Sequence, residues 1–302
     1  MEMNLFQQEA ARILPQVEFR YQEPLSKHTS FRIGGPAEIM AFPKNAAELS
    51  SLLKLSKKLD IKPAILGAGT NILAPDEGTS GLIICLKDCL NGIEQLPGSR
   101  IQVMAGVTMA RAAVFAANHG LSGMEFAHGI PGSLGGGIYM NAGAYGGEIG
   151  QICESVTVMD AEGQMRQMGR EDLKFRYRHS VLEETGDIVV SAVLALTEAS
   201  PDAIKDRMKE LLSKRSASQP LDLPSAGSAF KRPVGGYAAA LIEQSGLKGF
   251  RVGNAAISSK HAGFAVNLGG ATAQDVRSLL QQVSDRVYAD SGIRLEPEIR
   301  IW

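Results

Sequence analysis

The chain has 302 residues, of which 44% are hydrophobic and 21% are charged, and its mean hydropathy is close to zero. Its formal net charge of −1 provides no global positive field that would attract nucleic acid or an anionic membrane. No apolar run approaches the roughly 20 residues that a membrane-spanning helix requires. We therefore expect neither nucleic acid nor a membrane as a partner. The length of the chain is sufficient for two domains.

The N-terminus and the cysteines indicate a reducing compartment. Residues 1–16 form an amphipathic stretch that contains acids and lacks the basic start and apolar centre of a signal peptide. Cys85, Cys89 and Cys153 are too few for a disulfide framework, and no second pair of ligands stands at metal-binding spacing. The sequence therefore predicts a reduced, cytoplasmic protein without a metal.

The first 200 residues alternate between helix and strand patterns. A helix is predicted at 45–60, with Asn45 as its cap, and another at 108–120, capped by Thr108. Apolar runs and turn signals predict strands at 62–71, 81–86, 100–107 and 187–199, and a hairpin at 154–168 with its turn at "DAEG". This order is typical of a mixed α/β fold.

A domain boundary is predicted after residue 200. There Ser200 and Pro201 begin a helix, and "QPLDLPSAGS" then breaks regular structure. The apolar stripe of this helix is Ile204, Met208, Leu211 and Leu212. A second α/β unit follows, with a helix at 272–292 capped by Thr272.

Two glycine-rich tracts suggest a phosphorylated ligand. Residues 128–150 contain nine glycines and a single formal charge, and "LGAGTN" at 66–71 follows a predicted strand. The shorter tract has Ile72 where a dinucleotide fingerprint would need its third glycine, so an ordinary Rossmann unit is not indicated. Bare backbone amides can still approach phosphate oxygens, and two such tracts suggest a long ligand with a pyrophosphate. The alternative is that the glycines form tight turns between strands.

The second unit has a local basic bias. Between residues 221 and 270 there are five basic side chains and two acidic ones. A solvated face would explain this pattern, and so would a site for a multiply charged anion such as a diphosphate.

Seven motifs in a fixed order resemble one enzyme family. The motifs are "HTSFRIGGPA" (28–37), "LGAGTN" (66–71), "GIPGSLGGGIYMNAGAYGGEI" (129–149), "FRYRHS" (175–180), "LPSAGSAFKRP" (223–233), "GLKGFRVGNAAIS" (246–258) and "LEPEIRI" (295–301). From about residue 25 to its end, the chain resembles the UDP-N-acetylenolpyruvoylglucosamine reductases (UDP-N-acetylmuramate dehydrogenases), in the shorter subclass that lacks an extra tyrosine-bearing loop.

The resemblance implies a fold and a cofactor. It implies a two-lobed FAD-binding domain of the vanillyl-alcohol-oxidase type at 1–200, with lobes at about 1–86 and 87–200, followed by a smaller α/β substrate-binding domain at 201–302. FAD would be bound without a covalent bond. The residues expected to line it are Gly67, Ala68, Gly69, Thr70, Asn71, Gly132, Ser133, Gly135, Gly136, Asn141, Ala142 and Gly143.

The resemblance also implies a reaction and its residues. NADPH reduces the flavin, and the enolpyruvyl ether of UDP-N-acetylglucosamine enolpyruvate is then reduced to UDP-N-acetylmuramate, in peptidoglycan precursor synthesis. Ser228 matches the family's proton donor, Arg178 the arginine that binds the substrate carboxylate, and Glu298 the catalytic carboxylate. Strand alternation would set Glu298 opposite the apolar side chains of "LEPEIRI", but Glu296 shares that parity, and only the family match chooses between them.

Four basic residues are candidates for the substrate's diphosphate and carboxylate: Lys231, Arg232, Lys248 and Lys260. The longer subclass tends to carry asparagine at position 232, which puts the transfer of that role in doubt. We expect the protein to act as a monomer on these small molecules.

Two alternatives remain open. Another FAD-dependent oxidoreductase of the same fold often holds its flavin covalently, and His128 is the candidate for that bond. A non-catalytic nucleotide-sugar-binding module would hold no tight flavin. A yellow purified protein would exclude the module, and release of the flavin by acid would argue against covalent attachment.

Overall fold

The computed structural model describes residues 2–302, and the chain forms two compact units. Unit 1 contains Met1–Tyr21, Ile39–Ala68 and Gly81–Ser213, and unit 2 contains Gln22–Glu38, Gly69–Ser80 and Lys214–Trp302. Two N-terminal segments therefore belong with the C-terminal part of the chain, which a single boundary after residue 200 does not describe. The prediction of a mixed α/β fold is confirmed.

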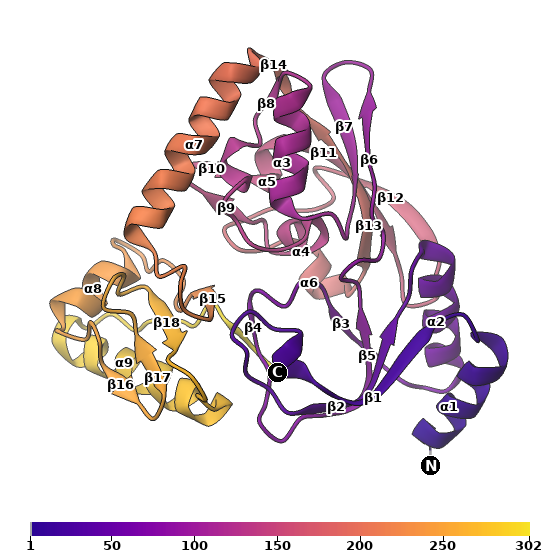
Figure 1. The fold of residues 1–302 in the computed structure, drawn as a ribbon, viewed down its shortest axis with the longest axis horizontal. Coiled ribbons are helices and arrows are strands. Elements are labelled where there is room, and N and C mark those ends of the chain that lie inside the picture. Colours follow the sequence, from indigo (N-terminus) through magenta and orange to yellow (C-terminus); the bar gives the residue numbers. More distant parts are fainter. Residues whose placement is uncertain (1) are drawn as a thin grey trace. The chain divides into compact units, whose positions relative to one another are not determined.

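A five-stranded antiparallel sheet with the order β12-β11-β13-β7-β6 forms one part of unit 1 (Figure 1). Its strands are β6 (Ile93–Leu96), β7 (Arg100–Met104), β11 (Cys153–Met159), β12 (Met165–Gly169) and β13 (Ile188–Ala195). The predicted hairpin is confirmed as β11 and β12, in which Met159 faces Met165 across the "DAEG" turn.

A second, four-stranded sheet has the order β1-β2-β5-β3, and β3 and β5 run parallel. Three of its strands contain a chain position at which the two units divide. The strands are β1 (Glu18–Pro24), β2 (Pro36–Phe42), β3 (Ala64–Leu66) and β5 (Thr79–Cys85). Cys85, Cys89 and Cys153 are free and buried, and burial raises the pKa of both Cys89 and Cys153 to about 12, so these thiols are protonated at neutral pH.

The helices of unit 1 pack with its two sheets, and the buried apolar side chains of helices and sheets form one core. The side chain of Asn45 accepts a hydrogen bond from Glu48 N at the start of α2, and Thr108 does the same for Arg111 N at the start of α3, which confirms both predicted caps. The helices are α1 (Glu2–Ile13), α2 (Ala46–Lys58), α3 (Met109–Asn118), α4 (Leu134–Tyr139), α5 (Ile149–Ile152) and α6 (Leu182–Thr185).

Unit 1 also contains a short 3-10 helix and two pairs of short strands, and a long helix follows them. The short elements are η2 (Glu125–Ala127) and the paired strands β8 (Leu121–Ser122) with β14 (Thr197–Glu198) and β9 (Gly143–Ala144) with β10 (Gly147–Glu148). The predicted helix at 200 is α7 (Pro201–Ser218), which begins at the proline as expected.

Unit 2 contains an antiparallel sheet of order β15-β18-β17-β16 with helices α8 and α9 (Figure 1). Its elements are η1 (Leu25–Lys27), β4 (Ile72–Leu73), β15 (Ser225–Ser228), α8 (Ala238–Gln244), β16 (Arg251–Val252), β17 (Ala255–Ile257), β18 (Phe264–Asn267), α9 (Ala273–Ser291) and β19 (Arg300–Ile301). Phe31 and Leu73 are completely buried in the same core as Val276 and Leu279 of α9. This shared core explains why Gln22–Glu38 and Gly69–Ser80 belong to unit 2.

Asp76, in the segment Gly69–Ser80, forms two hydrogen bonds with the start of helix α9. Its Oδ1 accepts from Ala273 N at 2.7 Å and its Oδ2 from Gln274 N at 3.1 Å, in the first turn of α9. Thr272 and Asp275 form a capping box at the same helix end, as the predicted cap at Thr272 required.

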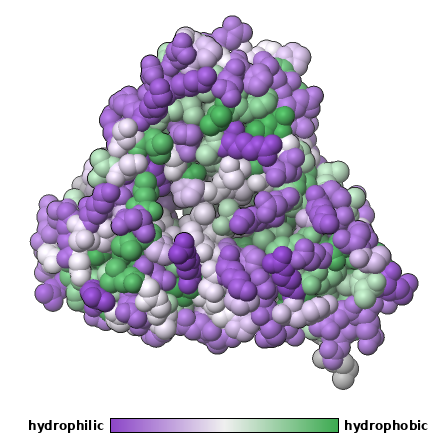
Figure 2. All heavy atoms as spheres, in the orientation of Figure 1, coloured by the Kyte–Doolittle hydropathy of each residue, from purple (hydrophilic) through white to green (hydrophobic). Residues whose placement is uncertain are grey.

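The surface in view mixes polar and apolar areas. Figure 2 shows hydrophilic side chains interrupting smaller hydrophobic areas over the face that it presents. Within residues 2–302, no helix has both the length and the apolar character that crossing a membrane would demand.

We predict that Asp76→Ala lowers the free energy of unfolding of unit 2 by about 1–2 kcal/mol, because two amides at the start of α9 lose their acceptor. Urea unfolding can be followed by fluorescence of Trp302, the single tryptophan, whose backbone N donates to Leu73 O in unit 2. Asp76→Asn, which keeps an acceptor oxygen, should lose less. Equal midpoints for Asp76→Ala and the unsubstituted protein would contradict the assigned role of Asp76.

Candidate active site

The glycine segment at 128–150 folds into a short helix, α4, followed by the β9–β10 hairpin. Ser133 caps α4, and Leu134 N and Gly135 N donate to Val107 O at 2.8 Å and Ala105 O at 2.9 Å. These bonds fix the start of the helix on the loop that follows β7. A helix at "LGGGIY" was not predicted, because glycine is a weak helix former.

Several glycines of this segment allow close packing within the protein. A Cβ at Gly137 would lie 2.8 Å from Met109 Sδ, one at Gly147 would lie 2.5 Å from the Phe126 ring, and one at Gly143 would lie 2.6 Å from Gly147 O. The ligand suggested by the sequence therefore does not account for the whole of the bare backbone. Close contact between backbone and side chains explains part of it.

Two predicted cofactor residues instead have few atoms near their missing Cβ positions. A Cβ built on Gly67 would meet one atom within 4 Å, Ser133 Oγ at 3.2 Å, and one on Gly136 would meet the same atom at 3.6 Å. Gly67 and Ala68 follow β3, so the structure brings the end of this strand to the start of α4 within unit 1. Gly132, with φ +132°, directly precedes Ser133 in a conformation that favours glycine.

Asn141 holds the glycine segment to the "FRYRHS" motif. It is 1% exposed, its Oδ1 accepts from Gly150 N at 2.8 Å, and its Nδ2 donates to Arg176 O at 3.0 Å. Ser180 Oγ adds a bond to Tyr139 O at 2.8 Å. Both polar atoms of the Asn141 side chain thus have partners within the protein, and these bonds connect the glycine segment to the turn that carries Arg178.

Arg178 lies at the tip of the turn that these bonds hold. Arg176 and His179 exchange backbone hydrogen bonds of 3.1 Å, which places Tyr177 and Arg178 at the two central positions. Arg178 has φ +54°, an unusual conformation for a residue with a side chain. Its Nη1 donates to Gly143 O at 3.2 Å, and Ala142 N donates to Gly137 O at 2.7 Å, so this predicted catalytic residue lies against the glycine segment.

The remainder of "LGAGTN" lies in unit 2. Gly69 is buried with φ +65°, and a Cβ there would lie 2.0 Å from His28 O, so only glycine fits. Asn71 Nδ2 donates to Glu298 O at 3.1 Å, and Arg300 N donates to Asn71 O at 2.9 Å. Thr70 lies between Gly69 and Asn71, and Asn71 is bonded to the segment that contains Glu298.

Backbone pairing brings the neighbourhoods of Ser228 and Glu298 together within unit 2. Glu298 N donates to Ala229 O at 2.9 Å, and Lys231 N donates to Glu296 O at 2.8 Å. Ser228 ends β15 opposite Phe264, one residue after Gly227, whose φ is +79°. Two predicted catalytic residues about 70 positions apart in sequence thus lie on adjoining segments.

The alternation predicted for "LEPEIRI" is only partly correct. The regular strand is limited to Arg300–Ile301, Ile301 is 44% exposed, and Glu298 is 9% exposed. Pro297 has no N–H to donate and forms an isolated bridge with Phe230, so no regular strand extends through the whole motif, as the parity argument assumed. Glu298 is therefore a buried carboxylate, and Glu296, which shares its parity, is exposed.

The four basic candidates have partners in this structure. Lys231 forms an ion pair with Glu296, Lys248 Nζ lies 2.9 Å from Glu243 Oε1, and Lys260 Nζ donates to Ser216 O at 2.7 Å. The Arg232 guanidinium lies over the ring of Tyr237, 4.3 Å from its centroid. The local basic bias is thus partly offset by acids, and Tyr237 is a contact that the sequence pattern did not reveal.

The electrostatics near Lys248 favour a neutral histidine. Burial lowers the pKa of His261, and the positive charge of Lys248 lowers it further. Because the charge of Lys248 acts on His261, and His261 directly follows Lys260, the two lysines lie in one region of unit 2. A neutral imidazole there adds no competing charge at neutral pH.

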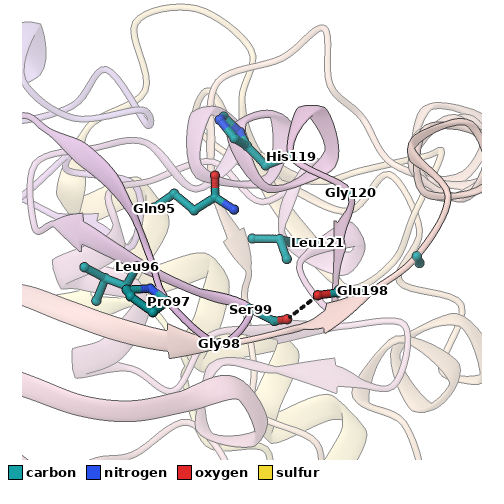
Figure 3. Close-up of a pocket in the computed structure, with 10 residues that line it drawn as sticks. Gln95, Leu96, Pro97, Gly98, Ser99, His119, Gly120, Leu121 and Glu198 are labelled. Carbon is teal, nitrogen blue, oxygen red and sulfur yellow. Dashed lines mark hydrogen bonds between the residues drawn. The ribbon is translucent and has the colours of Figure 1, made fainter.

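A surface cavity of about 390 Å³ lies elsewhere in unit 1. Residues 95–99, 119–121 and 198–199 line it, and Figure 3 shows Ser99 Oγ donating to Glu198 Oε1, at 3.3 Å, at its edge. No predicted site residue lines this cavity. We therefore base the candidate site on the paired motifs and not on this hollow.

Two family models match the chain. One describes an FAD binding domain and matches residues 37–169, and the other describes the C-terminal domain of UDP-N-acetylenolpyruvoylglucosamine reductase and matches residues 219–302. The first range contains the glycine segment, and the second contains Ser228, Glu298 and the four basic candidates.

Similar proteins extend the match to nearly the whole chain. A UDP-N-acetylenolpyruvoylglucosamine reductase of Streptococcus pneumoniae is 43% identical over 96% of this chain and 95% of its own length. One of Agathobacter rectalis is 44% identical over 95% of each chain. The crystal structure of the Thermus caldophilus reductase matches with a TM-score of 0.77 and 35% identity, over 95% of this chain and 98% of that one. The chain therefore belongs to the UDP-N-acetylenolpyruvoylglucosamine reductase family.

Proposed function

We propose that this protein reduces the enolpyruvyl ether of UDP-N-acetylglucosamine enolpyruvate to UDP-N-acetylmuramate, with FAD as cofactor and NADPH as reductant. The observation that carries the proposal is the pairing of Ala229 with Glu298, which sets the serine motif beside the carboxylate motif. Both motifs stand in a chain whose relatives, matched over nearly all of their length, bear the name of this reductase.

The residues present fit FAD. Among the described residues outside their own chain neighbours and helix, only Ser133 Oγ lies within 4 Å of the missing Cβ positions of Gly67 and Gly136, so a phosphate could approach the backbone there. His128 Nδ1, at the start of the same segment, is buried and has no hydrogen-bond partner among the described residues. A bound group that supplied a partner would remove the cost of this orphaned atom. We assign the pyrophosphate to the neighbourhood of Gly67, Ser133 and Gly136.

When bound, FAD would supply the hydride-transfer chemistry that links oxidation of NADPH to reduction of the enolpyruvyl double bond of the substrate. Arg178 is assigned to the substrate carboxylate, because its planar guanidinium can form two parallel bonds to a carboxylate and stabilise negative charge that develops beside it. The turn that presents Arg178 is held by Asn141 and Ser180, so the guanidinium starts from a fixed backbone.

Ser228 is assigned as the proton donor to the substrate carbon, and Glu298 as the carboxylate that assists the enolic intermediate. A serine hydroxyl is a weak acid in water, so its donation needs a fixed position and an acceptor that is developing negative charge. The backbone bonds around Ala229 provide the fixed position. Glu298 is 9% exposed, which limits its hydration.

Lys231, Arg232, Lys248 and Lys260 are assigned to the diphosphate and carboxylate of the substrate. An anionic ligand would compete with Glu296 and Glu243 for the two paired lysines. The proposal further places the reaction in the cytoplasm, where NADPH is the available reductant, and takes the protein to be a monomer that uses small molecules alone.

We predict that Gly136→Ala weakens FAD binding by about 5- to 150-fold, because the new methyl group occupies the open space assigned to the pyrophosphate. The apoprotein should be as stable as the unsubstituted one or more so, since alanine favours helix and the Cβ meets no atom closer than 3.6 Å. Flavin fluorescence titration and a thermal melt measure the two effects. Gly169→Ala on β12, whose Cβ would also meet an atom at 3.6 Å, is the matched control and should change neither. Unchanged FAD affinity in Gly136→Ala would refute this assignment.

We predict that Ser228→Ala leaves flavin reduction by NADPH nearly intact and slows reduction of the enolpyruvyl substrate by about 10² to 10⁴ or more, the usual effect of a positioned proton donor. Stopped-flow absorbance of the flavin separates the two half-reactions. Ser225→Ala on the same strand is the control and should affect neither strongly. Equal losses in both half-reactions would show that Ser228 has a structural role.

A further inference from the structure

The loop that carries Arg232 is fixed at both ends and open in the middle. Before it, Phe230 is 4% exposed and pairs with Pro297, and after it α8 packs against α9. Between these anchors Val234 is 99% exposed, and a Cβ at Gly236 would meet no atom within 4 Å. The centre of the loop therefore lacks the packing that would hold a long side chain in one direction.

A contact between side chains joins the two ends of this loop. The guanidinium of Arg232 lies 4.3 Å from the centroid of the Tyr237 ring, which is the distance of a cation–π interaction. Tyr237 is the residue before α8, but its side chain makes no capping hydrogen bond there, and the residue is 61% exposed. An aromatic ring at this position is thus not explained by the helix or by burial.

Stacking suits an arginine that must also bind an anion. The ring contacts the face of the guanidinium, and hydrogen bonds to an oxyanion use the N–H groups at its edge, so one does not displace the other. Lys231 and Lys248 differ, because each faces an acid with which an anion must compete. The neutral Tyr237 ring contacts Arg232 without occupying the N–H groups at the edge of the guanidinium.

We propose that Tyr237 is a positioning residue that holds Arg232 for the diphosphate of the nucleotide-sugar substrate. The proposal rests on the proposed function. Arginine loses rotamer freedom when it binds, and a stack formed in advance removes part of that loss. Tyr237 therefore affects substrate affinity through Arg232 and has no part in the transfer of hydride or proton.

The test measures steady-state KM for UDP-N-acetylglucosamine enolpyruvate and, separately, the rate of flavin reduction by NADPH in the FAD-loaded enzyme. Tyr237→Ala should raise this KM about 3- to 30-fold and leave flavin reduction unchanged. Tyr237→Phe, which keeps the ring, should restore the KM to within about twofold. The double variant with Arg232→Ala should be no worse than Arg232→Ala alone, because the ring acts only through the arginine.

A matched control lies in the same unit. Arg294 stacks on Tyr288 at 4.6 Å, and Tyr288 on α9 is 48% exposed, so Tyr288→Ala removes a similar contact away from the loop. Its KM should equal that of the unsubstituted enzyme.

The outcomes separate the two proposals. If Arg232→Ala raises KM and Tyr237→Ala does not, or if the two effects simply add in the double variant, the positioning role is wrong and the reductase function stands. An enzyme that bleaches with NADPH yet never turns over the enolpyruvyl substrate would overturn the proposed function itself, and with it the role of Tyr237.

Discussion

Close approach of backbone segments at glycine is the constraint on which both units depend. A Cβ at Gly35 would lie 2.1 Å from Asp76 O, and one at Gly78 would lie 2.0 Å from Pro36 O. These contacts join Gln22–Glu38 to Gly69–Ser80 in unit 2. In unit 1, a Cβ at Gly106 would lie 1.7 Å from Cys89 O, and one at Gly143 would lie 2.6 Å from Gly147 O. Backbone segments can therefore approach one another closely because side chains are missing at these points.

The predicted site residues are held with different degrees of rigidity. Arg178 lies on a turn whose left-handed backbone is fixed by Asn141 and Ser180, and Ser228 lies beside a backbone pairing with the Glu298 segment. Arg232 instead extends from an open loop, where its guanidinium stacks on Tyr237. This difference agrees with the assigned roles, since charge stabilisation and proton donation need fixed geometry, whereas recognition of a diphosphate tolerates a loop that adjusts.

Local signals in the sequence predicted local structure well. Asn45, Thr108 and Thr272 each cap the helix that they were expected to begin, because a cap depends on residues three positions apart. Long-range features were not accessible in this way. The membership of Gln22–Glu38 in unit 2 depends on burial of Phe31 among residues more than 190 positions later, which no local pattern reports. Helix α4 was missed because its stability comes from packing on Ala105 and Met109, against the low helix propensity of glycine.

The central claim is that this chain transfers a hydride from NADPH, by way of its flavin, to an enolpyruvyl nucleotide sugar. An anaerobic titration recorded in the visible spectrum tests it most directly, with NADPH added until the flavin bleaches and UDP-N-acetylglucosamine enolpyruvate added afterwards. The account predicts that the oxidised flavin band returns on the second addition, in proportion to the substrate supplied. Bleaching without recovery would contradict the substrate assignment, and a protein that takes up no FAD would contradict the interpretation of the glycine tracts.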